Sequence, residues 1–387
     1  MKGLAEIWAA LPEARMVGGA VRDTLAGREV ADVDFASPLT PAEVMARAKA
    51  AGLKAVPTGV EHGTVTLVAD GRGFEVTTLR RDVETDGRHA RVEFSDSWRE
   101  DAARRDFTIN AMFMAKDGEV FDYFGGRADL ASGNVRFVGD PAARIAEDYL
   151  RILRFFRFFA RYGRGKPDAS AVAAITERRE GLRWLSAERV WSELKKILLA
   201  PAPLAAVELM QETGVLEIVL PGAKPERLAA LLERGAPVDP LLRVAALTDE
   251  DLTVRLHLSG NEAERLAGWR KPPGLVPEDS DIALRRALAE EPYEVLVGRV
   301  WLWGGGEVGW AALRERLAMI ERPVFPLKGR DLAVLGVKPG PGMGDMLARV
   351  RHWWMEAGCV ADKAACLEAA RALSQNASLS AERPKAG

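Results

Sequence analysis

The residues with the clearest chemical potential lie within the first forty positions. Gly18-Gly19-Ala20-Val21-Arg22 precedes Asp32-Val33-Asp34. Paired glycines at the start of a predicted helix let backbone N–H groups approach a phosphate closely, and Arg22 adds a cation within the first turn. On a strand predicted over residues 30–35, Asp32 and Asp34 project from the same face. Adjacent carboxylates repel one another unless a cation lies between them, and oxygen ligands of this kind suit Mg²⁺.

These features together predict a site for metal-assisted nucleotidyl transfer, in which Mg²⁺ activates an attacking hydroxyl and stabilises the departing pyrophosphate. Taken singly, each feature has a simpler interpretation, because Gly-Gly turns join many strands to helices and an Asp pair is typical of exposed strand ends. Their succession over residues 18–34 favours the catalytic interpretation. A third acid, Glu75 on a strand predicted over residues 74–79, either joins the pair or faces outward.

A second set of candidate residues follows a predicted helix. At about 100° per residue, six charged side chains fall within about 140° of arc, and four apolar side chains gather on another side. The charged set is Arg144, Glu147, Arg151, Arg154, Arg157 and Arg161, and the apolar set is Ile152, Phe155, Phe156 and Phe159. The apolar side predicts packing into a core. The basic side is either a solvated face or a surface that contacts nucleotide and RNA phosphates.

Composition narrows the class of protein. Of the 387 residues, 48% are hydrophobic and 28% are charged, which is typical of a globular protein and excludes a disordered or collagen-like chain. The net charge is −2, so any nucleic-acid surface must be local. Two cysteines without a Cys-x-x-Cys motif argue against a disulfide framework or a structural zinc site. Without a signal peptide or a stretch of ~20 apolar residues, a cytoplasmic location away from membranes is predicted, with no obligate protein partner.

Two different residue patterns, one before and one after about residue 138, predict an α+β fold. Up to residue 137, short β-rich runs at 30–35, 63–68, 74–79 and 134–138 alternate with Gly and Asp turns. Beyond Asp140-Pro141, long stretches rich in Ala, Leu, Arg and Glu have helical spacing. A mixed-sheet domain followed by an all-helical remainder is therefore expected. Clusters of Pro and Gly predict further boundaries, which divide the chain into residues 1–137, 138–200, 201–322 and 323–387.

The ordered motifs over residues 16–200 resemble those of bacterial class II CCA-adding enzymes and the related poly(A) polymerases. The matching segments are Gly18–Asp23, Asp32–Asp34, His62–Thr66, Glu75–Arg80, Asp86–Arg88, Arg104–Ala111, Asp122–Gly126, Glu147–Arg151 and Glu188–Trp191. The resemblance implies a polymerase-beta-like nucleotidyltransferase head (1–137), a neck that recognises the base (138–200), a helical body (201–322) and a tRNA-binding tail (323–387). It also implies template-independent addition of C, C and A to the tRNA 3′ end from CTP and ATP with Mg²⁺.

The same resemblance implies roles for nine residues. Gly19, Arg22 and Arg105 contact the nucleotide, Asp32 and Asp34 hold the metal, and Asp148 with Arg151, helped by Arg154 and Arg157, reads the incoming base. The chemistry agrees with that assignment, because cytosine and adenine both present an amino donor beside an acceptor. A carboxylate acceptor next to a guanidinium donor matches either pattern and fails on uracil or guanine.

Other interpretations remain beside this one. A poly(A) polymerase and an enzyme that adds only the terminal A share the same motifs. A catalytically inactive RNA-binding relative is a third alternative, which the intact Asp32 and Asp34 disfavour. The polar segment over residues 83–91 is predicted to be a mobile loop, associated in the family with the step from C to A, or alternatively a long hairpin connection.

Overall fold

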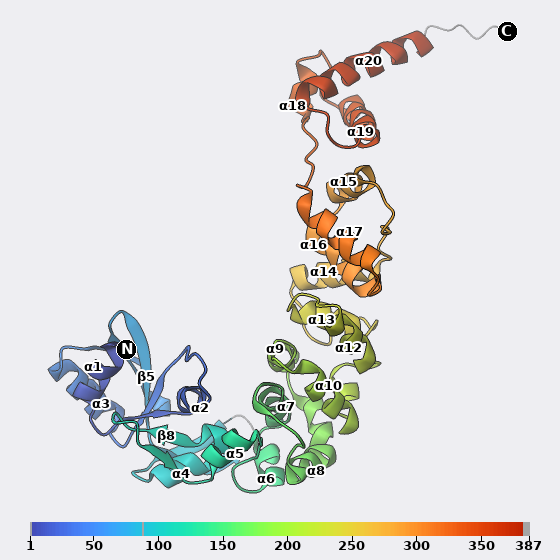
Figure 1. Cartoon of the computed structure of the whole chain (residues 1–387). Coiled ribbons are helices and arrows are strands. Elements are labelled where there is room, and N and C mark those ends of the chain that lie inside the picture. The colour runs from blue at the N-terminus through green and yellow to red at the C-terminus, as the bar shows by residue number, and fades with distance from the viewer. Residues whose placement is uncertain (1, 87–88, 382–387) are drawn as a thin grey trace. The chain divides into compact units, whose positions relative to one another are not determined.

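The computed structural model describes residues 2–86 and 89–381, and the chain divides into two compact units (Figure 1). The first is Met1–Pro225 with Glu250–His257, and the second is Glu226–Asp249 with Leu258–Gly387. The first unit contains a mixed sheet followed by helices, and the described part of the second unit is helical, which confirms the predicted α+β class. Within the described ranges, no helix has both the length and the apolar character needed to cross a membrane. The division into four segments stays a prediction.

Seven strands form the sheet of the first unit, in the order β3-β4-β5-β2-β1-β8-β9. Strands β2 and β5 pair in parallel, and the other neighbouring strands of this sheet pair antiparallel. Their bounds are β1 (Arg15–Val17), β2 (Asp34–Ser37), β3 (Lys54–Gly59), β4 (Thr64–Ala69), β5 (Arg72–Thr78), β8 (Met112–Met114) and β9 (Val120–Asp122). A separate two-stranded sheet consists of β6 (Arg80–Asp86) and β7 (His89–Phe94).

The first unit contains helices α1 to α11. Among them, α1 and α3 both contact strand β4. Their bounds are α1 (Lys2–Ala10), α2 (Gly19–Leu25), α3 (Pro41–Ala50), α4 (Trp98–Ala103), α5 (Gly126–Ser132), α6 (Pro141–Glu147), α7 (Leu150–Tyr162), α8 (Ala169–Arg178), α9 (Ala187–Leu198), α10 (Pro203–Glu212) and α11 (Val215–Val219). Short 3-10 helices cover η1 (Val60–His62), η2 (Thr108–Asn110) and η3 (Arg179–Trp184).

The described helices of the second unit pack around their own apolar clusters. Their bounds are α12 (Pro225–Glu233), α13 (Pro240–Leu247), α14 (Gly260–Arg270), α15 (Asp281–Glu290), α16 (Tyr293–Trp303), α17 (Val308–Met319), α18 (Gly329–Ala333), α19 (Pro341–Glu356) and α20 (Lys363–Ala381). One cluster contains Leu284, Leu296 and Leu313, and another contains Trp354 and Cys366. Trp354 is buried among apolar side chains, so it packs in the core of this unit.

The sheet forms where apolar and polar residues alternate. Along β4 every second residue is buried, as a sheet with one covered face requires. The turn between β4 and β5 falls at Asp70-Gly71, where both residues have positive φ, as a tight hairpin turn demands. On the covered face, Trp8 of α1 packs edge-on against Phe35 of β2 at a centroid distance of 5.4 Å. This packing holds β2, the strand that begins at Asp34, in place.

The strand predicted over residues 30–35 has wrong bounds, and the strand predicted over residues 134–138 does not form. Strand β2 begins at Asp34 instead of residue 30, because its last partner in β1 is Val17. Beyond Val17, Gly18 adopts a φ of +64° and directs the chain into α2, so residues 30–33 have no strand beside them on that side. The predicted strand at 134–138 is a single antiparallel bridge between Phe107 and Phe137.

The segment over residues 83–91 is not a loop along its described backbone, because β6 and β7 pair there as an antiparallel hairpin. The alternative prediction, a long hairpin connection, is the one that the backbone follows. Gly87 and Arg88, which the predicted loop includes, lie outside the described residues.

The single helix predicted through Arg144 and Arg161 is also wrong, because two helices, α6 and α7, meet at Asp148. Asp148 has an extended backbone, with φ −155° and ψ 108°, and its Oδ1 accepts the N–H of Leu150 at 3.1 Å. The carboxylate thus replaces a helical partner for one of the first amides of α7. The predicted apolar side is confirmed, since Ile152, Phe155, Phe156 and Phe159 are buried.

Candidate active site

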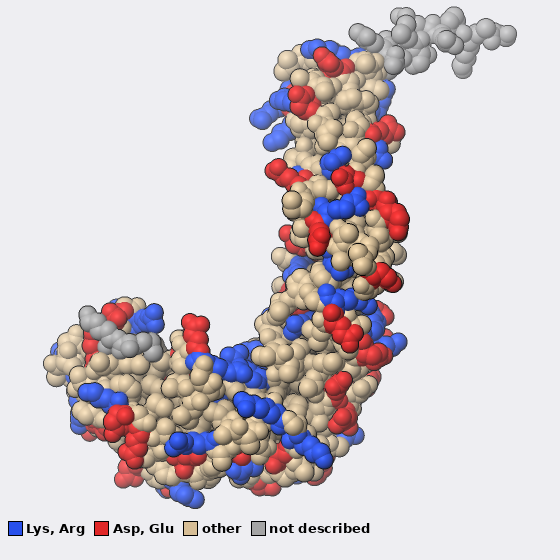
Figure 2. Space-filling model, viewed as in Figure 1, with Lys and Arg blue, Asp and Glu red and all other residues tan. Residues whose placement is uncertain are grey.

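A cavity of about 600 Å³ opens in the first unit where the head sheet meets the helices after it. It brings together eight of the nine residues predicted for the site: Gly19, Arg22, Asp34, Arg105, Asp148, Arg151, Arg154 and Arg157. The ninth, Asp32, is exposed and lies close enough to Asp34 to influence its ionisation. Basic side chains gather on this part of the unit in the space-filling view (Figure 2). Residues that lie more than a hundred positions apart in the sequence therefore line the same cavity.

The Gly18-Gly19 turn keeps one end of the cavity open. A Cβ on Gly18 would lie 3.4 Å from Nη1 of Arg105, and a Cβ on Gly19 would lie 3.5 Å from Nη2 of Arg22. Gly18 also has a φ of +64°, a conformation that residues with a side chain rarely adopt. The first N–H groups of α2 have no partner within the helix. The turn thus presents amides between two guanidinium groups.

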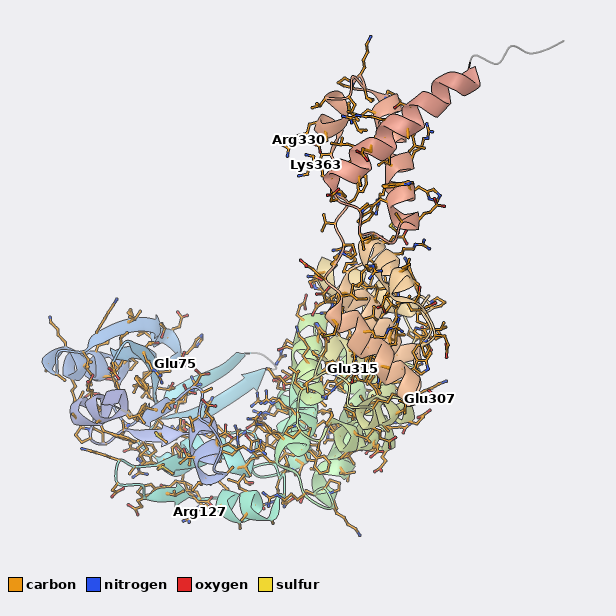
Figure 3. The ribbon with its side chains drawn as sticks, turned by 45° about the horizontal axis from the view of Figure 1, so that its top comes forward. Glu75, Arg127, Glu307, Glu315, Arg330 and Lys363 are labelled. Atoms are coloured by element: carbon orange, nitrogen blue, oxygen red, sulfur yellow. The ribbon has the colours of Figure 1, made fainter. Side chains whose placement is uncertain are left out.

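The acids lie near one another at the start of β2. Asp34 is the first residue of the strand and Asp32 precedes it, with the buried Val33 between them, and the charge of Asp32 acts on the ionisation of Asp34. In the parallel pairing of β2 with β5, Asp34 lies directly beside Glu75, which is labelled in Figure 3. Desolvation, together with the negative charges of Glu75 and Asp32, raises the pKa of Asp34 above its ordinary value of 3.8, and Arg105 opposes the rise. This corner of the cavity therefore carries an excess of negative charge.

A divalent cation fits this donor set. Among the described residues, no group of three or more His, Cys, Asp or Glu side chains is arranged to hold a metal ion. Two carboxylates, Asp32 and Asp34, are the protein ligands on offer, and Mg²⁺ commonly takes few protein oxygens and completes its shell with water and substrate phosphate. Desolvation, followed by the charges of Glu75 and Asp32, raises the pKa of Asp34, and a bound cation would favour its ionised form.

A buried carboxylate that sequence reasoning assigned no role connects the two halves of the cavity. Asp106 accepts from Nε of Arg154 at 2.6 Å and from Nδ2 of Asn110 at 3.0 Å. Asn110 in turn accepts from Nη1 of Arg22 at 2.6 Å. Burial alone would raise the pKa of Asp106, but the Arg154 charge and these hydrogen bonds hold it below 3.8. Asp106 and Asn110 lie in the Arg104–Ala111 segment, where only Arg105 was predicted to act.

The residues that were predicted to read the base are held by partners of their own. Oδ2 of Asp148 accepts from Nη2 of Arg189 at 2.8 Å, and Arg151 pairs with Glu147 and donates to the backbone oxygen of Arg144 at 2.7 Å. Arg157 pairs with Glu193 at 3.0 Å. Arg189 lies in the Glu188–Trp191 motif and was also missed, because nothing in a sequence shows that residue 189 reaches residue 148. The solvated-face interpretation of the basic side is therefore wrong for Arg151 and Arg157.

The fold and the cavity define a class of protein: a nucleotidyltransferase with a poly(A)-polymerase-type head. The model of the poly A polymerase head domain matches residues 14–136, and that of a probable RNA and SrmB-binding site of polymerase A matches residues 166–227. The chain belongs to the family of CCA-adding enzymes, or CCA tRNA nucleotidyltransferases. This conclusion rests on relatives of high identity that match over most of their length.

Two relatives and one solved structure illustrate the similarity. The CCA tRNA nucleotidyltransferase 1, mitochondrial, of Danio rerio is 38% identical, with 91% of this chain and 86% of that protein covered. A CCA-adding enzyme of Levilactobacillus brevis is 34% identical, with 88% and 89% covered. The crystal structure of the Bacillus stearothermophilus CCA-adding enzyme in complex with CTP is 26% identical, with a TM-score of 0.69 over 97% of this chain and all of that one.

We predict that Asp106→Asn lowers the free energy of unfolding near pH 7 by about 3 kcal/mol, because Arg154 would remain without its countercharge. The pKa of Asp106 in the folded protein lies below 3.8. The stabilisation is therefore present above that value and is lost as the pH falls through the lower folded pKa. Urea unfolding of wild type and variant from about pH 7 to about pH 3 should show the two converging in acid.

Glu119→Gln, at an exposed position of the same unit, is the matched control and should leave stability unchanged at both ends of the range. A stability difference between wild type and Asp106→Asn that stays constant down to acid would contradict the assigned charge state.

Proposed function

We propose that this chain adds C, C and A to the 3′ end of tRNA from CTP and ATP, without a template, and releases pyrophosphate. The observation that carries the proposal is the single cavity in which the Gly18-Gly19 turn, the Asp34 carboxylate and the Asp148–Arg151 pair face the same space. The names of the relatives, and the CTP complex of the Bacillus stearothermophilus enzyme, support the same conclusion. Enzymatic nucleotidyl transfer is the chemistry that this family performs.

Asp32 and Asp34 are the proposed ligands of Mg²⁺. When bound, the ion would supply Lewis-acid activation of the tRNA 3′ hydroxyl and neutralise charge on the leaving pyrophosphate. The chain's own contribution is to hold two carboxylates near one another at the start of β2, with Val33 buried between them. The role of Glu75 stays open, because its place beside Asp34 suits either a third ligand or a charge that tunes the pair.

Gly19, Arg22 and Arg105 are the proposed contacts of the triphosphate. Arg22 is fixed by Asp23 and Asn110, and Arg105 is fixed by Asp101 at 2.8 Å, so neither guanidinium loses much freedom when a phosphate arrives. Preorganised donors are worth more than mobile ones, since no ordering cost is added at binding. The two glycines allow the phosphates to approach the backbone.

Asp148 and Arg151, with Arg154 and Arg157 behind them, are the proposed readers of the base. Arg189 and the Leu150 N–H hold the Asp148 carboxylate in place, and Glu147 holds Arg151. A rigid acceptor beside a rigid donor discriminates strongly, because a wrong base leaves buried polar groups unpaired. The same pair accepts both cytosine and adenine, so a change in its geometry has to account for the switch between them.

The tRNA is the proposed acceptor partner, and the helical segments 201–322 and 323–387 are its proposed docking region. The match of residues 166–227 to a probable RNA-binding region supports RNA contact next to the cavity. The proposed cytoplasmic location rests on Cys359 and Cys366, which are both free thiols, as a reducing compartment allows.

The product length tests the proposal against its alternatives. Incubation with Mg²⁺ and a tRNA that ends at the discriminator base should give three added nucleotides with CTP and ATP together, and two with CTP alone. A long adenylate ladder would indicate a poly(A) polymerase, and one residue added only to a tRNA already ending in CC would indicate an A-adding enzyme. No incorporation at all would indicate an inactive RNA-binding relative.

Removal of either metal ligand, by Asp32→Ala or Asp34→Ala, should reduce incorporation by at least about 10³-fold, the equivalent of several kcal/mol of transition-state stabilisation. The midpoint of thermal unfolding should not fall, because each change removes one of several carboxylates that repel one another. Asp117→Ala, at an exposed turn of the same unit, serves as the control. Substantial turnover in both site variants would show that the metal site lies elsewhere.

Asp148→Ala should relax base choice while metal binding stays intact. Loss of one buried hydrogen-bond acceptor corresponds to about 10- to 100-fold in the ratio of kcat/KM between correct and incorrect nucleotides. Competition of CTP with UTP, and of ATP with GTP, measures this ratio. Glu177→Ala, at an exposed carboxylate of α8, should leave it unchanged. Wild-type selectivity in Asp148→Ala would refute the templating role.

A further inference from the structure

A second cavity, of about 460 Å³, lies in the first unit where the ends of α2 and α7 approach α5. Its charged lining consists of four arginines, Arg28, Arg127, Arg161 and Arg164, with no Asp or Glu among the residues that line it. Three of them are exposed, and Arg127 is labelled on α5 in Figure 3. Of its arginines, Arg161 belongs to the charged set singled out in the sequence, and no proposed step of nucleotide addition uses this cavity.

The two cavities differ in how their arginines are neutralised. Each of the six arginines that line the active-site cavity forms an ion pair with a carboxylate: Arg22 with Asp23, Arg105 with Asp101, Arg151 with Glu147, Arg154 with Asp106, Arg157 with Glu193 and Arg189 with Asp148. Within residues 2–86 and 89–381, none of the four arginines of the second cavity pairs with a carboxylate. Asp23, which lies outside the lining, attracts Arg161 electrostatically. The second cavity therefore concentrates positive charge that no ion pair within the described residues neutralises.

Interactions with the C-terminal ends of α2 and α7 stabilise only some of the four guanidinium groups. Nη2 of Arg28 donates to the backbone oxygen of Arg161 at 2.9 Å, and Nε of Arg161 donates to the Tyr162 hydroxyl at 3.1 Å. The guanidinium groups of Arg127 and Arg164 have no hydrogen-bond partner in the described part of the chain. The dipoles of α7 and α2 stabilise cations at their last turns only weakly. Two guanidinium groups therefore remain available to an anion.

We propose that this second cavity binds phosphate groups. Guanidinium forks match phosphate oxygens in pairs, and several convergent cations offset their mutual repulsion when an anion enters between them. The phosphodiester backbone of the tRNA is the expected source, because the exposed arginines open the cavity to a long ligand, and free pyrophosphate is the other source with the same chemistry. The choice of RNA rests on the proposed function, whereas the phosphate site itself does not.

Tyr162 connects this cavity to the active site. Its hydroxyl donates to Asp23, the carboxylate that pairs with Arg22. The guanidinium carbons of Arg22 and Arg28 lie 4.6 Å and 4.8 Å from the centre of its ring. A phosphate held in the second cavity would thus be one side chain away from the arginine proposed to hold the triphosphate. This proximity suits an RNA strand that approaches the catalytic acids.

The double variant Arg127→Gln/Arg164→Gln tests the proposal in the full-length chain. Glutamine keeps most of the aliphatic stem, and the thermal midpoint reports whether the fold is retained. The control is Lys54→Gln/Arg72→Gln, which removes two exposed charges of the same unit from β3 and β5. Three quantities are measured for each protein: the Kd for a tRNA transcript over a salt series without nucleotides, the Kd for inorganic pyrophosphate, and kcat with KM for tRNA.

If RNA supplies the phosphates, the site variant should bind tRNA about tenfold more weakly, and the slope of log Kd against log salt should fall by about 2, one unit for each lost phosphate contact. The KM for tRNA should rise, and kcat should remain at the wild-type value. If free phosphate is the source, the tRNA Kd stays and the pyrophosphate Kd rises about tenfold, which also supports a phosphate site. Unchanged Kd values for both probes, or equal losses in the control variant, would overturn the proposal.

A wild-type chain that binds tRNA but adds no nucleotide would refute the proposed function alone. The binding measurements would still decide whether the second cavity holds phosphate, so the two failures are distinguishable.

Discussion

The active site depends on one buried charge, the carboxylate of Asp106. It accepts from Arg154 of α7 and from Asn110, and Asn110 accepts from Arg22 of α2, so one chain of hydrogen bonds connects α7 with α2. A charge buried without partners is expensive, which means that this network tolerates few alternative arrangements. The network thus connects α7, which begins just after Asp148, with α2, which begins at the Gly18-Gly19 turn.

Charge pairing divides the basic residues of the first unit into two kinds. In the active-site cavity each arginine has a carboxylate partner, which sets its orientation and leaves remaining donors for a ligand. Such preorganisation suits recognition of a particular base or phosphate, because little freedom is lost on binding. In the second cavity no arginine forms an ion pair with a carboxylate of the described residues, and this arrangement suits attraction of a polyanion without base specificity. The two kinds match the two demands of adding a chosen nucleotide to an RNA end.

Much of the site was accessible to sequence reasoning because local rules govern it. The Gly18-Gly19 turn, the closeness of Asp32 to Asp34, and the buried apolar side of α7 all follow from short-range spacing. The α+β class followed from the change of texture near residue 140. The start of β2 and the break at Asp148 were missed, since one depends on the length of a neighbouring strand and the other on a carboxylate that accepts a backbone amide.

The sequence by itself determined which residue types the site has and which of them belong to one turn, strand or helix, because those relations repeat every two or 3.6 residues. Only the tertiary structure decided which distant groups meet: Glu75 beside Asp34, Arg189 on Asp148, Asp106 on Arg154, and four arginines around one cavity. Those contacts arise from strand order and helix packing. Both are set by burial summed over the whole unit, which no local pattern encodes.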